Sequence, residues 1–367
     1  MSPRILYLAT ADARGHLMRA QLLVHALRDA GASVEVLTTS VQGQQFLLRF
    51  GIQAQVLSVH YAVQFDDRQN MLRTATNRNV AHYLFRPGRM LRDVGRLQRR
   101  LRAADLVIND SFHPALLHMG MLPGWRRKVV HVYGASLKAA LISNFAGVGP
   151  RLLGRMFGWV VHRQLHLARA CIEHDFACEI DDAAAPALHR LPTPVALAEA
   201  TPAQATGGAA VYLNPHFSDP GLADALSAGL VDAGLAAHRV GEGYAGRDGW
   251  IAVDPDWAHH AAHAQLIVSA PGMAALSIAL VYQRPILLVL SDQPEQASNA
   301  ARAAQLKLLH QVVVWNGDAG QFQREVAQAA ARLCAAATPD PAAADGRRRA
   351  QTRIDAWVSR LLALGRH

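Results

Sequence analysis

Cysteine is scarce in this sequence, and its scarcity restricts both the fold and the compartment. Three cysteines occur among 367 residues, namely Cys171, Cys178 and Cys334. Their spacing fits no zinc motif, and their odd number argues against a disulfide framework. We therefore expect a protein of the reducing cytoplasm.

Long uncharged apolar runs and a dinucleotide fingerprint are also missing. No such run approaches the roughly 20 residues that cross a bilayer, and the chain passes from Arg4 into a predicted strand without the apolar core of a signal peptide. The loop after that strand contains Gly15 but no G-x-G-x-x-G. These absences argue against a transmembrane helix, an N-terminal signal and a dinucleotide-dependent dehydrogenase.

Acidic residues are outnumbered by basic ones. The 37 Lys and Arg against 28 Asp and Glu give a net charge of +9, which favours anionic partners such as nucleotide phosphates or anionic lipid. A nucleic-acid partner has only this charge in its favour, and we expect none. Hydrophobic residues make up 51% of the chain, so it is globular, and its length suits two domains.

Strand and helix patterns alternate in the C-terminal half. The sequence predicts a strand at 266–268, a turn at Ser269–Gly272, an apolar helix at Met273–Gln283, a strand at Ile286–Leu290, a polar loop at Ser291–Ser298 and a helix from about Asn299. Short apolar strands beside an apolar helix indicate a parallel sheet covered by helices. Ligands of such sheets bind at the carboxyl ends of the strands.

The N-terminal half has the same alternation. A strand at Ile5–Ala9 precedes a helix at His16–Ala30, and another strand at 106–108 leads to Asp110. A histidine paired with a carboxylate can act as a general base. Two plainer interpretations stay open: His16 caps the helix, and Asp110 is a cap or one member of a salt bridge.

Several short motifs together resemble one family. Gly272, Pro285, Glu295, Gln296 and Asn299 match the donor-binding domain of GT-B glycosyltransferases, closest to the peptidoglycan-precursor N-acetylglucosaminyltransferases and the UDP-glycosyltransferases. The resemblance implies an α/β fold of two Rossmann-like parallel-sheet domains facing across a cleft. We expect an acceptor-side domain at 1–185, a linker at 186–208, a nucleotide-sugar domain at 209–340 and a C-terminal helix at 345–367 packing back on the first domain.

The resemblance also implies an activity and a set of site residues. The activity is an inverting transfer of a hexose-type sugar from a nucleotide-diphospho-sugar, UDP-linked in the families resembled, to an acceptor hydroxyl. His16 is implied as the base and Asp110 as the residue that orients it. Residues implied at the donor are Gly15, Asn214, His216, Val253, Asp254, Pro271, Gly272, Met273, Glu295, Gln296 and Asn299. Such enzymes use no bound metal, and we expect no cofactor.

Two departures from the family pattern keep other functions open. Ile278 stands where the families carry a Glu that holds the donor ribose, and Asn214, Pro215 and His216 replace small residues at a phosphate-binding turn. A non-catalytic sugar-nucleotide-binding or accessory protein on the same fold is therefore one alternative. A sugar-nucleotide epimerase is another.

Two segments suggest where an acceptor or a membrane binds. Seven arginines stand against one acid, Asp93, between Arg86 and Arg102, and 139–161 is largely apolar. A basic amphipathic helix can lie on an anionic membrane surface, which would suit a lipid-linked acceptor and a peripheral place at the inner face of the cytoplasmic membrane. The plainer interpretation is a helix that covers the sheet. The H-x-x-x-H pair His259 and His263 is interpreted as a solvated helix face rather than a metal site.

Overall fold

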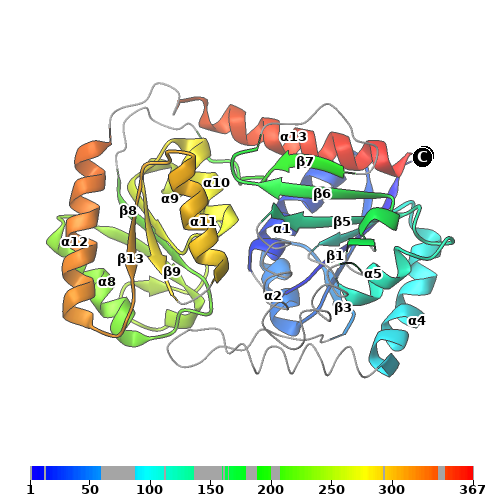
Figure 1. The fold of residues 1–367 in the computed structure, drawn as a ribbon, viewed down its shortest axis with the longest axis horizontal. Coiled ribbons are helices and arrows are strands. Elements are labelled where there is room, and N and C mark those ends of the chain that lie inside the picture. Colours follow the sequence, from blue (N-terminus) through cyan, green and yellow to red (C-terminus); the bar gives the residue numbers. More distant parts are fainter. Residues whose placement is uncertain are drawn as a thin grey trace. The chain divides into compact units, whose positions relative to one another are not determined.

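The structure is a computed structural model that describes residues 2–11, 14–58, 87–110, 113–135, 159, 162–163, 165–178, 188–199, 207–291, 294–337 and 344–366. The chain divides into two compact units (Figure 1). The described residues up to Pro194, together with those from Arg353 onward, form the first unit. Those from Val195 to Thr352 form the second.

A seven-stranded sheet in which every pair of neighbours is parallel forms the centre of the first unit (Figure 1). Its strand order is β3-β2-β1-β4-β5-β6-β7. The strands are β1 (Arg4–Ala9), β2 (Ser33–Thr38), β3 (Ala54–Val56), β4 (Leu106–Asp110), β5 (Val129–Gly134), β6 (Ala170–Asp175) and β7 (Leu188–Pro192).

Both faces of this sheet are covered, which explains why the central strands β1, β4 and β5 are buried without alternation. In β1, Ile5 and Tyr7 belong to one core cluster and Leu6 and Leu8 to another, as expected for side chains that alternate between faces. The first cluster includes the inner side of α1 and Trp357. The helices are α1 (Arg14–Asp29), α2 (Val41–Arg49), α4 (Pro87–Ala103), α5 (Pro114–Met119) and the part of α13 (Gly346–Gly365) that follows Thr352.

The second unit repeats this plan with six strands, again all parallel. Their order is β10-β9-β8-β11-β12-β13. The strands are β8 (Gly207–Leu213), β9 (Ala237–Gly241), β10 (Trp250–Ile251), β11 (Ala264–Ser269), β12 (Ile286–Leu290) and β13 (His310–Val314), and the helices are α8 (Pro220–Asp232), η1 (Glu242–Tyr244), α9 (Trp257–His263), α10 (Met273–Tyr282), α11 (Pro294–Gln305) and α12 (Ala319–Ala336).

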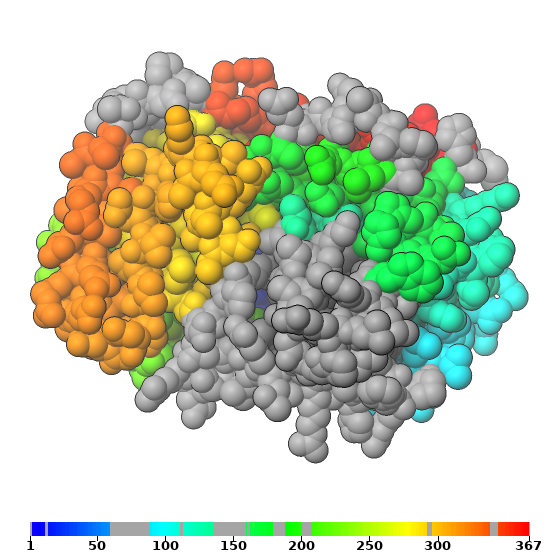
Figure 2. Space-filling model, in the orientation of Figure 1, coloured from blue at the N-terminus to red at the C-terminus, as the bar shows by residue number. Residues whose placement is uncertain are grey.

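Local sequence signals account for the helix ends of this unit. Asp219 caps α8 by accepting a hydrogen bond from the Gly221 amide, and proline occupies the first position of that helix. Helix α10 is buried along most of its length and ends at Gln283, which adopts a left-handed conformation with φ of 53°. Helix α12 packs against α8, and its outer side chains form one flank of this unit (Figure 2, orange).

Most predicted strands and helices are present, and two expectations require correction. The polar loop expected at Ser291–Ser298 is wrong from Pro294 onward, because α11 already begins there; a proline's fixed φ suits the first turn of a helix. Leu188–Pro192, expected within a linker, forms β7 and pairs with β6. The regions 60–85 and 139–158 lie outside the described residues. None of the helices in the described part of the chain combines the length and apolar character that spanning a membrane requires.

Candidate functional site

The strand order of the first sheet reverses between β1 and β4. Ligands of open parallel sheets bind at the carboxyl ends of strands beside such a reversal. Asp110 is the last residue of β4 and pairs in register with Ala9, the last residue of β1. The chain leaves β1 through Thr10 and enters α1, whose third residue is His16. The two residues predicted to form a catalytic pair therefore lie at this reversal.

Asp110 is fully buried, and both of its carboxylate oxygens accept hydrogen bonds. Tyr7 Oη donates to Oδ2 over 2.7 Å, while Arg19 donates from Nε to Oδ2 over 2.9 Å and from Nη2 to Oδ1. Burial alone would raise the pKa of Asp110, but the Arg19 charge and the hydrogen bonds from His16 and Arg19 outweigh it and hold that pKa well below its usual range. Asp110 is therefore ionised near neutral pH.

Arg19 connects this carboxylate to a buried histidine. Its side chain is 4% exposed, and its Nη1 lies 2.5 Å from His174 Nε2, while His174 Nδ1 lies 2.8 Å from Thr193 Oγ1. Because a guanidinium only donates hydrogen bonds, His174 accepts at Nε2 and carries its proton on Nδ1, facing Thr193. Burial and the Arg19 charge lower the pKa of His174 well below its ordinary value, so this ring stays neutral near pH 7.

His16 has two partners for the same ring nitrogen. Its Nδ1 lies 3.4 Å from Asp110 Oδ1 and 3.0 Å from Arg19 Nη2. When Nδ1 carries the proton, it donates to Asp110 and leaves Nε2 free to accept a proton. When Arg19 donates to Nδ1, the proton of a neutral ring lies on Nε2 instead. The first tautomer alone is a base at Nε2, so Arg19 competes with Asp110 for control of His16.

The second sheet reverses its order between β8 and β11. Ser269, the last residue of β11, donates from Oγ to the carbonyl of Tyr212 on β8 over 2.8 Å, which ties the two strand ends together. The turn after β8 is closed by the Asn214 side chain, whose Oδ1 accepts from the His216 amide over 3.1 Å. The residues predicted at the donor that flank this reversal are Asn214, His216, Pro271, Gly272 and Met273.

Helix α11 brings two further predicted residues to the same edge of the sheet. Asn299 is 3% exposed and donates from Nδ2 to the Pro271 carbonyl over 2.8 Å. Gln296 is also buried, and its Oε1 accepts from the amide and hydroxyl of Ser291 over 3.0 and 3.2 Å. Its side-chain carbonyl oxygen is thus bonded within the protein, and its predicted contact with the donor stays a prediction. The side chain of Glu295 lies outside the described part of the structure.

The remaining predicted residues differ in their surroundings. Gly15 is in the first turn of α1, and a Cβ there would meet nothing within 4 Å. Val253 and Asp254 follow β10 in the second unit. Ile278, at the position where the families carry a ribose-binding Glu, is 4% exposed on α10 and offers no hydrogen bond.

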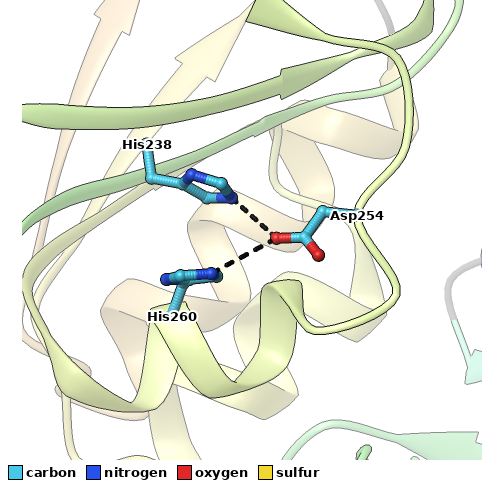
Figure 3. A group of neighbouring side chains, drawn as sticks. All are labelled: His238, Asp254 and His260. Atoms are coloured by element: carbon cyan, nitrogen blue, oxygen red, sulfur yellow. Dashed lines mark hydrogen bonds and ion pairs between the residues drawn. The ribbon is translucent and has the colours of Figure 1, made fainter.

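Asp254 belongs to a cluster with two histidines, which Figure 3 shows converging from separate elements. His238 on β9 places Nε2 2.7 Å from Asp254 Oδ2, and His260 on α9 places Nε2 3.5 Å from the same atom. Among the residues that the structure describes, this trio is the group of His, Cys, Asp and Glu side chains arranged closely enough to hold a metal ion.

Sequence reasoning missed Tyr7, Arg19 and His174 in the first unit. A signal for Arg19 exists, because it lies three residues after His16 on the apolar face of α1, where the neighbouring positions are buried leucine and alanine. A charged residue at an inward position needs a buried partner of opposite charge. Tyr7 and His174 give no such signal, since each lies in a strand buried on both faces.

Comparisons with known proteins define the fold. Neither protein-family models nor curated protein sequences match this chain, but solved structures do. The spinosyn rhamnosyltransferase SpnG matches with 16% identity and a TM-score of 0.60, covering 100% of both chains. UGT89C1 of Arabidopsis thaliana, complexed with quercetin, matches with 12% identity and a TM-score of 0.61, covering 98% of this chain and 100% of its own.

A third structure is the glycosyltransferase VinC in complex with dTDP, with 16% identity, a TM-score of 0.56 and 99% coverage of both chains. At these identities the matches establish the fold, in which two all-parallel α/β units follow one another along the chain. The chain has the fold of the GT-B glycosyltransferases, as its sequence motifs predicted.

Proposed function

We propose that this protein is an inverting glycosyltransferase that moves a sugar from a nucleotide-diphospho-sugar to an acceptor hydroxyl. One observation carries the proposal. On a chain with the GT-B fold, His16 and Asp110 meet at the reversal of the first sheet, with Nδ1 and Oδ1 3.4 Å apart. That is the arrangement a base needs if a carboxylate is to fix its tautomer.

The proposed reaction uses His16 as a general base. The acceptor oxygen attacks the anomeric carbon from the side opposite the diphosphate and loses its proton to His16 Nε2. The bond from that carbon to the diphosphate oxygen breaks, and the nucleoside diphosphate leaves with the electron pair. Asp110, ionised and anchored by Tyr7, stabilises the positive charge on the imidazole. Arg19 opposes that charge, so we expect His16 to act only in the tautomer bonded to Asp110.

The donor would bind at the carboxyl edge of the second sheet. Gly272 precedes α10 and lacks a side chain, and the first amides of a helix attract phosphate oxygens. Asn299 fixes the Pro271 carbonyl and so holds the loop in front of that helix. The complexes of similar folds contain dTDP in one case and quercetin in another. We therefore include both UDP- and dTDP-sugars as donors.

One observation favours a non-catalytic accessory protein instead. Ile278 is buried and apolar where a ribose-binding carboxylate is expected, so either the ribose is held by other groups or no donor binds. An epimerase would need no acceptor and would alter the sugar in the nucleotide-sugar alone.

Titration calorimetry of the whole chain with UDP, dTDP and GDP separates these cases. We expect at least one nucleoside diphosphate to bind. Asn299→Ala should weaken that binding, because the Pro271 carbonyl loses its hydrogen-bond donor and the loop before α10 is released. Gln321→Ala, on the exposed surface of α12, is the control and should bind as the wild type does. Absence of binding by all three would favour the accessory protein, and conversion of a nucleotide-sugar without acceptor would favour the epimerase.

The acceptor can be a small molecule or a lipid-linked one, and α4 supports the second. Its exposed face carries basic side chains and Leu91, which is 60% exposed; part of α4 is visible in cyan in Figure 2. The acid within the helix, Asp93, is only 2% exposed and accepts from Ser58 Oγ over 2.6 Å. The exposed basic residues are Arg89, Arg92, Arg96, Arg99 and Arg102. This surface suits peripheral attachment to an anionic membrane.

Sedimentation with phospholipid vesicles tests that attachment. The protein should pellet with vesicles rich in phosphatidylglycerol and stay in solution with pure phosphatidylcholine. Each basic residue near an anionic surface contributes about 1 kcal/mol to binding. The double variant Arg92→Glu/Arg99→Glu should therefore bind the anionic vesicles at least about 10-fold more weakly. Arg324→Glu/Arg332→Glu on α12 is the matched control. Equal pelleting by both double variants would refute the role of α4.

A further inference from the structure

The trio His238, Asp254 and His260 lies in the second unit. Asp254 is one of the residues predicted at the donor, whereas His238 and His260 have no role in the proposed transfer reaction. Its members come from β9, from the segment between β10 and α9, and from α9 itself. Their potential ligand atoms all lie within 4.8 Å of one another. The two imidazole rings are stacked, with centroids 4.0 Å apart and planes inclined by 28°.

A single carboxylate oxygen is the point on which both rings converge (Figure 3). Asp254 Oδ1 accepts a hydrogen bond from the Asp256 amide over 2.8 Å, which fixes the carboxylate in place. That bond leaves Oδ2 facing Nε2 of His238 and Nε2 of His260. An oriented carboxylate with two imidazole nitrogens beside it is a ligand set for a transition metal rather than for Mg²⁺ or Ca²⁺, which prefer oxygen.

The distances suit an ion between these atoms. A tetrahedral Zn²⁺ with bonds of about 2.0–2.2 Å keeps its ligand atoms about 3.3–3.5 Å apart. His260 Nε2 already lies 3.5 Å from Asp254 Oδ2. His238 Nε2, at 2.7 Å from that oxygen, has to withdraw by about 0.6–0.8 Å to reach that spacing. Its side chain is 33% exposed, so a small rotation meets little resistance.

Burial and charge are also compatible with metal binding. Asp254 is mostly buried, with 11% of its side chain exposed, whereas His260 is 46% exposed. One side of the trio is thus open to solvent, where water can complete the coordination. The Asp254 carboxylate also offsets part of the charge of a divalent cation.

We infer that His238, Asp254 and His260 form a binding site for a divalent transition-metal ion, with Zn²⁺ as the best fit. The ion connects β9, the segment after β10 and the middle of α9, and so fixes the conformation of residues 254–260. Its role is structural, and its binding requires neither donor nor acceptor.

Calorimetric titration of the tag-free, chelator-treated full chain with Zn²⁺ tests the site directly. We expect one ion per chain, and Co²⁺ should give the visible absorption of a four-coordinate ion. His260→Ala and Asp254→Asn should each weaken Zn²⁺ binding by at least about 10–100-fold, the loss that even an outer-shell partner costs. Far-ultraviolet circular dichroism checks that each variant is folded. Because His260 is nearly half exposed, its variant decides the test if Asp254→Asn is unfolded.

His259→Ala is the matched control. It lies on the same helix, its ring is 4.2 Å from that of His263, and these two form the H-x-x-x-H pair that sequence spacing singles out. Zn²⁺ affinity should be unchanged in this variant. Failure of the wild-type chain to bind either ion, full affinity in folded His260→Ala, or loss of binding in His259→Ala would each overturn the assignment.

Discussion

Replacing His16 with alanine should lower the rate of sugar transfer by about 10²–10⁴-fold, the contribution of a positioned general base. An acceptor hydroxyl is a weak nucleophile, and Nε2 of His16 is the group proposed to take its proton. The substitution removes the imidazole but leaves Asp110 bonded to Tyr7 and Arg19. Turnover is measured as release of nucleoside diphosphate under saturating donor, and nucleotide affinity by calorimetry. The affinity should change little, because the predicted donor residues other than Gly15 belong to the second unit.

His25→Ala is the control for this variant. His25 lies on the same helix as His16. Its Nε2 is 2.8 Å from the Phe50 carbonyl, so its hydrogen-bond partner is not Asp110. Its removal should leave turnover near that of the wild type. Unchanged turnover in His16→Ala would exclude His16 as the base.

Arg19→Met should destabilise the first unit by about 3–5 kcal/mol, the usual consequence of removing one partner from a buried ion pair. Methionine fills a similar volume but removes the cation beside the Asp110 carboxylate, which is 0% exposed. Tyr7 and His16 are left as its side-chain partners. His174 Nε2 loses its donor as well. Urea denaturation followed by circular dichroism measures the loss. Arg28→Met, which removes a partly buried bond to the Val34 carbonyl on the same helix, should cost much less.

The pH dependence of this loss identifies its cause. In the wild type, the pKa of Asp110 is held below its unfolded value, so its contribution to stability is present above the unfolded pKa and is lost as pH falls through the folded one. Without Arg19, burial raises the pKa instead, and the folded variant gains a proton more readily than the unfolded chain. The deficit of Arg19→Met should therefore be largest at neutral pH and shrink on acidification. Adding Asp110→Asn should recover part of the loss, and a constant deficit would contradict the ion-pair explanation.

Much of the fold could be predicted because buried parallel strands produce unbroken apolar runs. Ile286–Leu290 was predicted with the same limits that the structure gives β12. Strand β7, in contrast, has the sequence LHRLP; its His, Arg and Pro do not resemble a buried strand, although it pairs with β6. Helix α11 was placed too late because its first turn is rich in Pro, Glu and Gln, which in isolation are typical of a polar loop.

Some residues of the candidate sites could likewise be predicted from the sequence, and others could not. The proximity of His16 and Asp110 could be predicted because each follows a recognisable strand, and the sheet brings those strands together. Their catalytic role stays a prediction. The role of Arg19 could not be predicted, since its partners, Asp110 and His174, lie 91 and 155 residues away along the chain. The metal trio was missed for a related reason: helical spacing draws attention to His259 and His263, whereas the tertiary fold places His260 beside Asp254 and His238.

Incubation of the full chain with a panel of UDP- and dTDP-sugars and hydroxylated acceptors, aromatic, macrolide and lipid-linked, is the most direct test. We predict that nucleoside diphosphate is released only when both a donor and a suitable acceptor are present, and that the product has the anomeric configuration opposite to the donor's. A chain that binds the nucleotide yet leaves every donor intact with every acceptor would contradict a transferase function.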